Sequence, residues 1–163
     1  MGRWIAGLLA ILLTGFIGWW PFRQQDTGEL YIVDTLLVER KEANVRLYAG
    51  EAAGRGENMT EALRDLEEQA PGQLFLRQTC RVIYCGGAEA DVMDLPEDLP
   101  VGTYIYVWDR AAADLDVEKL KEVLEARERR NSDIPTLSKL ENQALTGQSV
   151  IPERLNWEAE HGA

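Results

Sequence analysis

Three residues of this 163-residue chain could provide thiol or imidazole chemistry: Cys80, Cys85 and His161. A thiolate can act as a nucleophile or metal ligand, and an imidazole can move protons near neutral pH. The cysteines lack CxxC spacing and any second Cys/His pair at zinc spacing, and His161 lies in a polar tail. We therefore predict no catalytic residues, no metal site and no cofactor, in a protein that is not an enzyme.

The two cysteines lie five positions apart in a stretch that reads as an extended strand. An odd separation on a regular strand points two side chains to opposite faces. We therefore expect Cys80 and Cys85 not to pair, and we interpret both as small buried hydrophobic residues. A redox pair or half of a metal site is the functional alternative.

The candidate binding residues are acidic. Residues 88–102 carry Pro96 and Pro100 among many carboxylates, which predicts a surface loop. Calcium prefers such ligands, but the DxDxDG order is missing, and a solvated acidic surface is the simplest alternative. Four of these side chains are our candidate partner-docking residues: Asp91, Asp94, Glu97 and Asp98. The formal net charge of −11 disfavours nucleic acid and favours a protein partner with a positive patch.

A Gly-x-Gly pattern at Gly54 and Gly56 precedes a predicted helix. Glycines in that position can let helix amides hold a phosphate. The third glycine of the dinucleotide fingerprint is missing, because Met59 occupies its position, and the following residues are acidic. We therefore expect a glycine-assisted turn from strand to helix.

The N-terminal region predicts a membrane segment. Residues 4–22 run without a charge, which at about 1.5 Å per residue is long enough to cross most of a bilayer core of about 30 Å. Arg3 before this run favours a cytoplasmic N-terminus and a cell-membrane, single-pass protein whose remainder lies outside the cytoplasm. A cleaved signal peptide is the alternative, although Gly18, Trp19 and Trp20 make a poor cleavage site.

The remaining elements follow from periodicity and from turn residues. Extended stretches are expected at 30–39, 45–52, 74–85 and 103–109, with the first two antiparallel and 80–85 a central strand covered on both faces. Helices are expected at 59–70 behind Asn58, through about 130 behind Asp116, and from Pro135 to a stop at Gly147.

These elements predict an α/β (α+β) fold with a small mixed sheet of about four strands and about three helices. The organisation is a membrane anchor or signal sequence at 1–22, a tether at 23–28, one extracytoplasmic domain at 29–157 and a polar tail at 158–163. The end of the chain from Ser149 is short, and Ile151 and Trp157 are the points at which it could dock on the domain.

One part of the chain resembles a known family. Gly54 and Gly56, the stretch 59–66 (MTEALRDL), the strand residues 74–76 and the stretch 81–86 (RVIYCG) resemble the N-terminal domain of the Ger(x)C family, the C subunits of spore germinant receptors. The segment 145–152 is similar to the piece that closes that domain. The family's lipid-modified cysteine is missing, with Phe16 near its place, and Thr79 stands where a histidine is common.

The resemblance implies a membrane-held, non-enzymatic accessory or scaffold subunit of a spore germinant-receptor-like complex. Its partners would be the membrane and a protein, such as a multi-span receptor subunit, and not nucleic acid. The alternative is an anchored cell-envelope inhibitor or immunity-type protein that blocks a partner with its acidic surface.

Overall fold

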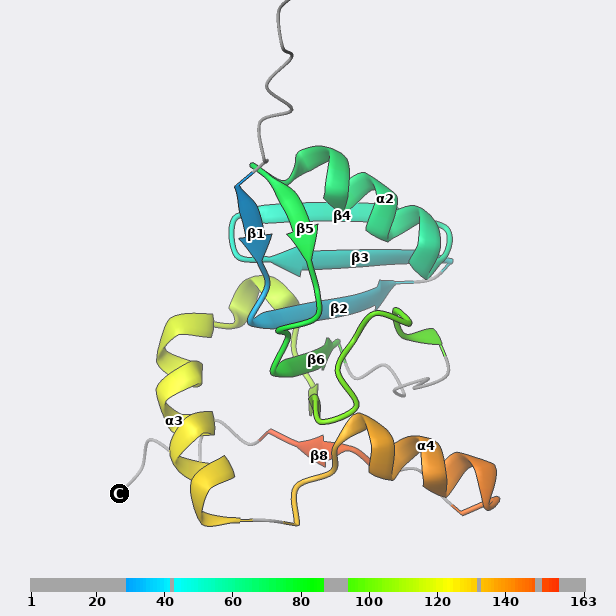
Figure 1. Cartoon of the computed structure of the whole chain (residues 1–163), viewed down its shortest axis with the longest axis vertical. Coiled ribbons are helices and arrows are strands. Elements are labelled where there is room, and N and C mark those ends of the chain that lie inside the picture. Colours follow the sequence, from blue (N-terminus) through cyan, green and yellow to red (C-terminus); the bar gives the residue numbers. More distant parts are fainter. Residues whose placement is uncertain (1–28, 42, 87–93, 132, 149–150, 156–163) are drawn as a thin grey trace, which may run out of the picture.

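The computed structural model describes residues 29–41, 43–86, 94–131, 133–148 and 151–155. Within them the chain forms a mixed α/β fold with three α-helices and two sheets (Figure 1). The elements are, in order, β1 (Leu30–Ile32), β2 (Thr35–Lys41), β3 (Asn44–Ala49), β4 (Ala52–Gly56), α2 (Met59–Gln69), β5 (Gln73–Phe75), β6 (Arg81–Cys85), β7 (Tyr104–Trp108), the 3-10 turn η2 (Ala112–Asp114), α3 (Val117–Arg130), α4 (Leu137–Leu145) and β8 (Glu153–Arg154).

The larger sheet has six strands in the order β4-β3-β2-β6-β7-β8. Strands β2, β3 and β4 are antiparallel neighbours, whereas β2, β6, β7 and β8 run parallel. Strand β6 lies in the middle, and all five of its residues are buried. The expected antiparallel pair and the central strand covered on both faces are therefore confirmed.

Side chains alternate between two apolar cores, one on each face of this sheet. Helices α2 and α4 cover one face, where Leu66 and Leu140 pack against strand residues such as Val82. Helix α3 covers the other face, where Leu120 and Leu124 pack around Tyr106 and Ile83. Each fully buried side chain of this kind contributes roughly 1.5–3 kcal/mol, so both cores hold the helices to the sheet.

The predicted helix caps are confirmed. The Asn58 side chain accepts a hydrogen bond from the Glu61 amide at 3.0 Å, and Asp116 accepts one from the Lys119 amide at 3.2 Å. Glu61 in turn accepts from the Glu57 amide. The last helix begins later than expected, at Leu137 behind Thr136, because the Pro135 carbonyl accepts a hydrogen bond from the Ile105 amide of β7.

Two expected strands are each divided in the structure, so the prediction of about four strands was too low. Stretch 30–39 becomes β1 and β2, and stretch 74–85 becomes β5 and β6. Both breaks fall at one junction, where the Thr79 hydroxyl donates to the Val33 carbonyl and the Asp34 carbonyl accepts from the Arg81 amide. The chain leaves the small parallel pair β1-β5 here and enters the large sheet. Stretch 45–52 is likewise interrupted, by a turn at Gly50 with φ +57°.

The expected turn at Gly54 and Gly56 was also wrong. Both residues lie in β4, directly beneath α2 (Figure 1). A Cβ added at Gly54 would lie 2.3 Å from the Ala62 carbonyl oxygen and 2.4 Å from the Leu66 amide nitrogen. The glycines therefore let the helix backbone approach the strand, and that contact leaves no room for a phosphate.

The predicted membrane segment, tether and polar tail lie outside the described residues. Within the part of the chain that the structure describes, no helix is both long and apolar enough to cross a bilayer.

Candidate docking surface

The structure describes three of the four candidate docking residues. Asp94 is half-buried and forms an ion pair with Arg40, at the end of β2. Glu97 and Asp98 are exposed, and the Asp98 carboxylate lies 3.7 Å from the Arg77 guanidinium. Asp91 lies outside the described residues.

The loop that carries these carboxylates is fixed by its apolar residues. Pro96 and Leu99 are buried, and Leu99 packs in the same core as α2 and α4. Two tight turns follow each other, with Leu99 N–H donating to the Pro96 carbonyl and Thr103 N–H donating to the Pro100 carbonyl. The buried Pro96 and Leu99 thus hold the loop against the core, and we call it the pinned loop; its Glu97 and Asp98 side chains are exposed to solvent.

A groove of about 430 Å³ separates this loop from α2. Its apolar lining residues are Met59, Leu63, Leu76, Leu95 and Pro96. Its polar and charged lining residues are Thr60, Arg64, Glu67, Asp94, Glu97 and Asp98. We call this feature the acidic groove. It could accept an apolar side chain of a partner while its carboxylates meet neighbouring cations.

Sequence reasoning found the acidic loop but missed its second wall. Helical spacing places Leu63 in one apolar stripe with Met59 and Leu66, and Leu63 nevertheless remains partly exposed at the groove. The apolar pair Leu95-Pro96 inside an acidic stretch is the signal that could have indicated an anchored loop.

A second polar cluster, missed entirely from the sequence, lies between the sheet and α3. The Arg81 guanidinium donates to both carboxylate oxygens of Glu128, at 2.7 and 2.6 Å, and the Tyr106 hydroxyl donates to the same carboxylate at 2.9 Å. Asp34 lies 3.3 Å from both Arg81 and Lys121. Glu128 belongs to the charged helix end 125–130 (EARERR), whose composition alone indicates a solvated face, yet its side chain is only 10% exposed.

Charges in this cluster support one another. Burial disfavours ionisation of Asp34, but the Lys121 ammonium and the Arg81 guanidinium outweigh it and hold the pKa of Asp34 below its usual value. Burial also disfavours the charged form of Arg81, and the hydrogen-bonded Glu128 carboxylate reverses this, so that the pKa of Arg81 is raised. Burial and the Glu128 charge raise the pKa of Tyr106. The cluster is therefore a salt bridge network in which the tyrosine stays a neutral donor.

The cysteine expectations are only partly correct. Both thiols are free, as predicted, and Cys85 is buried on β6. Cys80 is exposed and lies just before β6, because the chain turns into the sheet only at Arg81. Burial and the Asp34 carboxylate raise the pKa of Cys80, and burial with the Glu39 charge raises that of Cys85 to about 12. Neither environment activates a thiolate nucleophile.

Among the described residues, no group of three or more histidine, cysteine or acidic side chains is arranged to hold a metal ion. The acidic groove combines an apolar floor with carboxylates at its rim, an arrangement that can contact a protein surface. Comparison of the chain with protein-family models, curated proteins and solved structures finds no match.

Proposed function

We propose that this chain is a membrane-anchored, non-enzymatic accessory or scaffold subunit that docks on a membrane protein partner through the acidic groove. In this proposal the apolar segment 4–22 holds the chain in the cell membrane and the folded part lies outside the cytoplasm. The assembly resembles a spore germinant receptor. This part of the proposal depends on the resemblance of the segment 54–86 to the Ger(x)C family.

The observation that carries the docking proposal is the pinned loop. Long-lived protein contacts need groups whose positions are fixed before binding, since ordering a flexible loop costs affinity. Glu97 and Asp98 extend from a loop whose Pro96 and Leu99 are buried, beside an apolar floor. Carboxylates placed around an apolar groove can give specificity and speed encounter, which a merely solubilising surface does not require.

The residues that carry the family resemblance also form one contiguous unit. Strand β4, helix α2 and the groove wall follow each other in the chain, with Gly54 and Gly56 allowing α2 to lie against β4. Helix α2 then presents Met59 and Leu63 to the acidic groove. In the proposal, this unit sets the position of the docking surface relative to the sheet.

Site-specific photo-crosslinking tests the proposal. Glu97 is replaced by p-benzoylphenylalanine in the full chain, which is produced in its native cells and irradiated in intact membranes. A matched position is Glu141, which is also exposed but lies on α4. We expect a crosslinked membrane protein from position 97 and none from position 141.

Mass spectrometry of the crosslinked product separates the candidate functions. A multi-span membrane protein supports the accessory subunit, whereas a secreted or toxin-like protein supports the inhibitor or immunity-type alternative and overturns the proposal. Equal crosslinking from both positions, or none from position 97, would also contradict it.

A further inference from the structure

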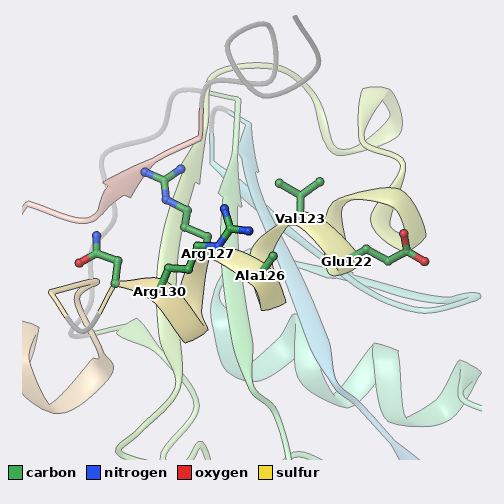
Figure 2. A pocket seen from close by; sticks show the side chains of 6 residues that line it. Glu122, Val123, Ala126, Arg127 and Arg130 are labelled. Carbon is green, nitrogen blue, oxygen red and sulfur yellow. The ribbon is translucent and has the colours of Figure 1, made fainter. Parts of the chain in front are cut away.

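A second groove, of about 570 Å³, runs along α3 on a different part of the molecule (Figure 2). Figure 2 shows Arg127 and Arg130 at one end and Glu122 at the other, with Val123 and Ala126 between them. Asn131, the residue that caps the helix, completes the lining. The groove therefore joins a small apolar floor to a cationic end.

The cationic end is unusual in this acidic chain, whose formal net charge is −11. The last turn of α3 carries Arg127, Arg129 and Arg130. These cations complement the partial negative charge at a helix C-terminus, but that effect does not require an apolar floor beside them. The groove fits a segment that carries an apolar side chain followed by carboxylates.

The chain itself supplies such a segment. Residues 156–163 read NWEAEHGA and include Trp157, Glu158 and Glu160. They follow Leu155, which is buried against Leu120 and Leu124 of α3. Leu155, the last residue that the structure describes, therefore lies against the helix that forms the groove.

Strand β8 already ties this end of the chain to the groove. The Glu153 carboxylate forms an ion pair with Arg127, which lines the groove. Val123 is the neighbour of Leu124 in the helix, and Trp157 lies two residues beyond Leu155, a span of about 7 Å in extended chain. An indole at that position can reach the floor of the groove.

We propose that residues 156–160 dock in the α3 groove of the same chain. The Trp157 ring covers Val123 and Ala126, and the carboxylates of Glu158 and Glu160 turn toward Arg130 and Arg127. This inference goes beyond the proposed docking function and does not depend on it.

Fluorine NMR of the full chain in detergent micelles, labelled with 5-fluorotryptophan, tests this docking. The Trp157 resonance is assigned by its loss in the Trp157→Phe variant. We expect this resonance in the wild type to lack the solvent isotope shift between H₂O and D₂O that an exposed indole shows. In Arg130→Glu we expect the protected resonance to be lost and the exposed one to appear.

Arg129→Glu is the matched control, because Arg129 has the same charge on the same turn but pairs with Glu125 and does not line the groove. We expect it to leave the Trp157 resonance protected. Combining Arg130→Glu with Glu158→Lys reverses both charges and should restore protection.

Three outcomes would overturn the proposal. A Trp157 resonance with a full solvent shift in the wild type would show that the segment is not docked. Protection that disappears on tenfold dilution would place it in the groove of a second copy instead. Equal effects of Arg130→Glu and Arg129→Glu would mean that the groove does not select the segment.

Discussion

Replacing Glu128 by Ala should destabilise the fold more than any other single change of a charged side chain considered above. The Glu128 carboxylate accepts three hydrogen bonds, two from Arg81 and one from Tyr106, and all three donors are attached to largely buried side chains. Truncation would leave the Arg81 guanidinium, whose side chain is 5% exposed, without its two-point partner.

The expected loss in the free energy of unfolding is about 3–5 kcal/mol, the usual cost of removing one partner of a buried ion pair. Asp34 remains 3.3 Å from Arg81 and compensates in part, so we expect the lower half of that range. Replacing both Arg81 and Glu128 by Met should cost less than Glu128→Ala alone, because no buried charge is then left unpaired.

Urea unfolding of the purified full chain in mild detergent, followed by circular dichroism, measures these differences. The matched control is Glu125→Ala, on the same helix, which removes an exposed pair with Arg129 worth about 0.3–0.5 kcal/mol. If Glu128→Ala cost no more than Glu125→Ala, the polar cluster would be solvated and the reasoning refuted.

Three further changes test other parts of the account. Gly54→Ala should lower the free energy of unfolding in urea by about 1–3 kcal/mol or more, because the added Cβ would clash with the backbone of α2. Gly102→Ala is the control and should be close to neutral, because a Cβ there has no atom within 4 Å. Equal effects of the two changes would contradict the close approach of α2 to β4. A thiol reagent at pH 8 should label only Cys80 in the folded chain and also Cys85 after denaturation, and two labelled thiols in the folded chain would show that β6 is not buried. The pKa of Asp34 is lowered in the folded chain, so ionised Asp34 adds to the free energy of unfolding above the unfolded pKa of about 3.9, and this addition is lost as pH falls through the folded pKa. The stability of the wild type should therefore fall more steeply below about pH 4 than that of Asp34→Asn. Identical pH profiles of the two proteins would contradict the ion pairs of Asp34.

Local rules predicted the elements whose stability is local. Helices α2 and α3 begin where Asn58 and Asp116 can cap them, and the apolar run before Cys85 forms the buried central strand. These features depend on residues a few positions apart, so periodicity and capping chemistry are sufficient to find them.

Long-range contacts decided what the sequence analysis missed. The breaks at Asp34 and Thr79 exist because two distant stretches meet there, and Gly54 is needed only because a helix crosses it. Glu128 looked like one member of a solvated charge run, since nothing local shows that Arg81, 47 positions earlier, points at it.

One part of the acidic groove could be predicted from local sequence, and the other part depends on long-range packing. The carboxylates Glu97 and Asp98 could be proposed from composition and from the flanking prolines. The apolar floor could not, because it joins Leu63 of α2 to Leu95 of the loop, two residues far apart in the sequence that pack against the same core.

The most direct test of the docking claim is co-purification, without irradiation, of the membrane partner that crosslinking identifies, at low and at high salt. The Glu97→Lys/Asp98→Lys double variant reverses the exposed carboxylates of the groove, while Glu51→Lys/Glu141→Lys makes the same change in charge at exposed positions outside its lining. We predict that wild type and control recover the partner at low salt, less of it at high salt, and that the groove variant recovers little at either. Unchanged recovery by the groove variant at both salt concentrations would contradict the account.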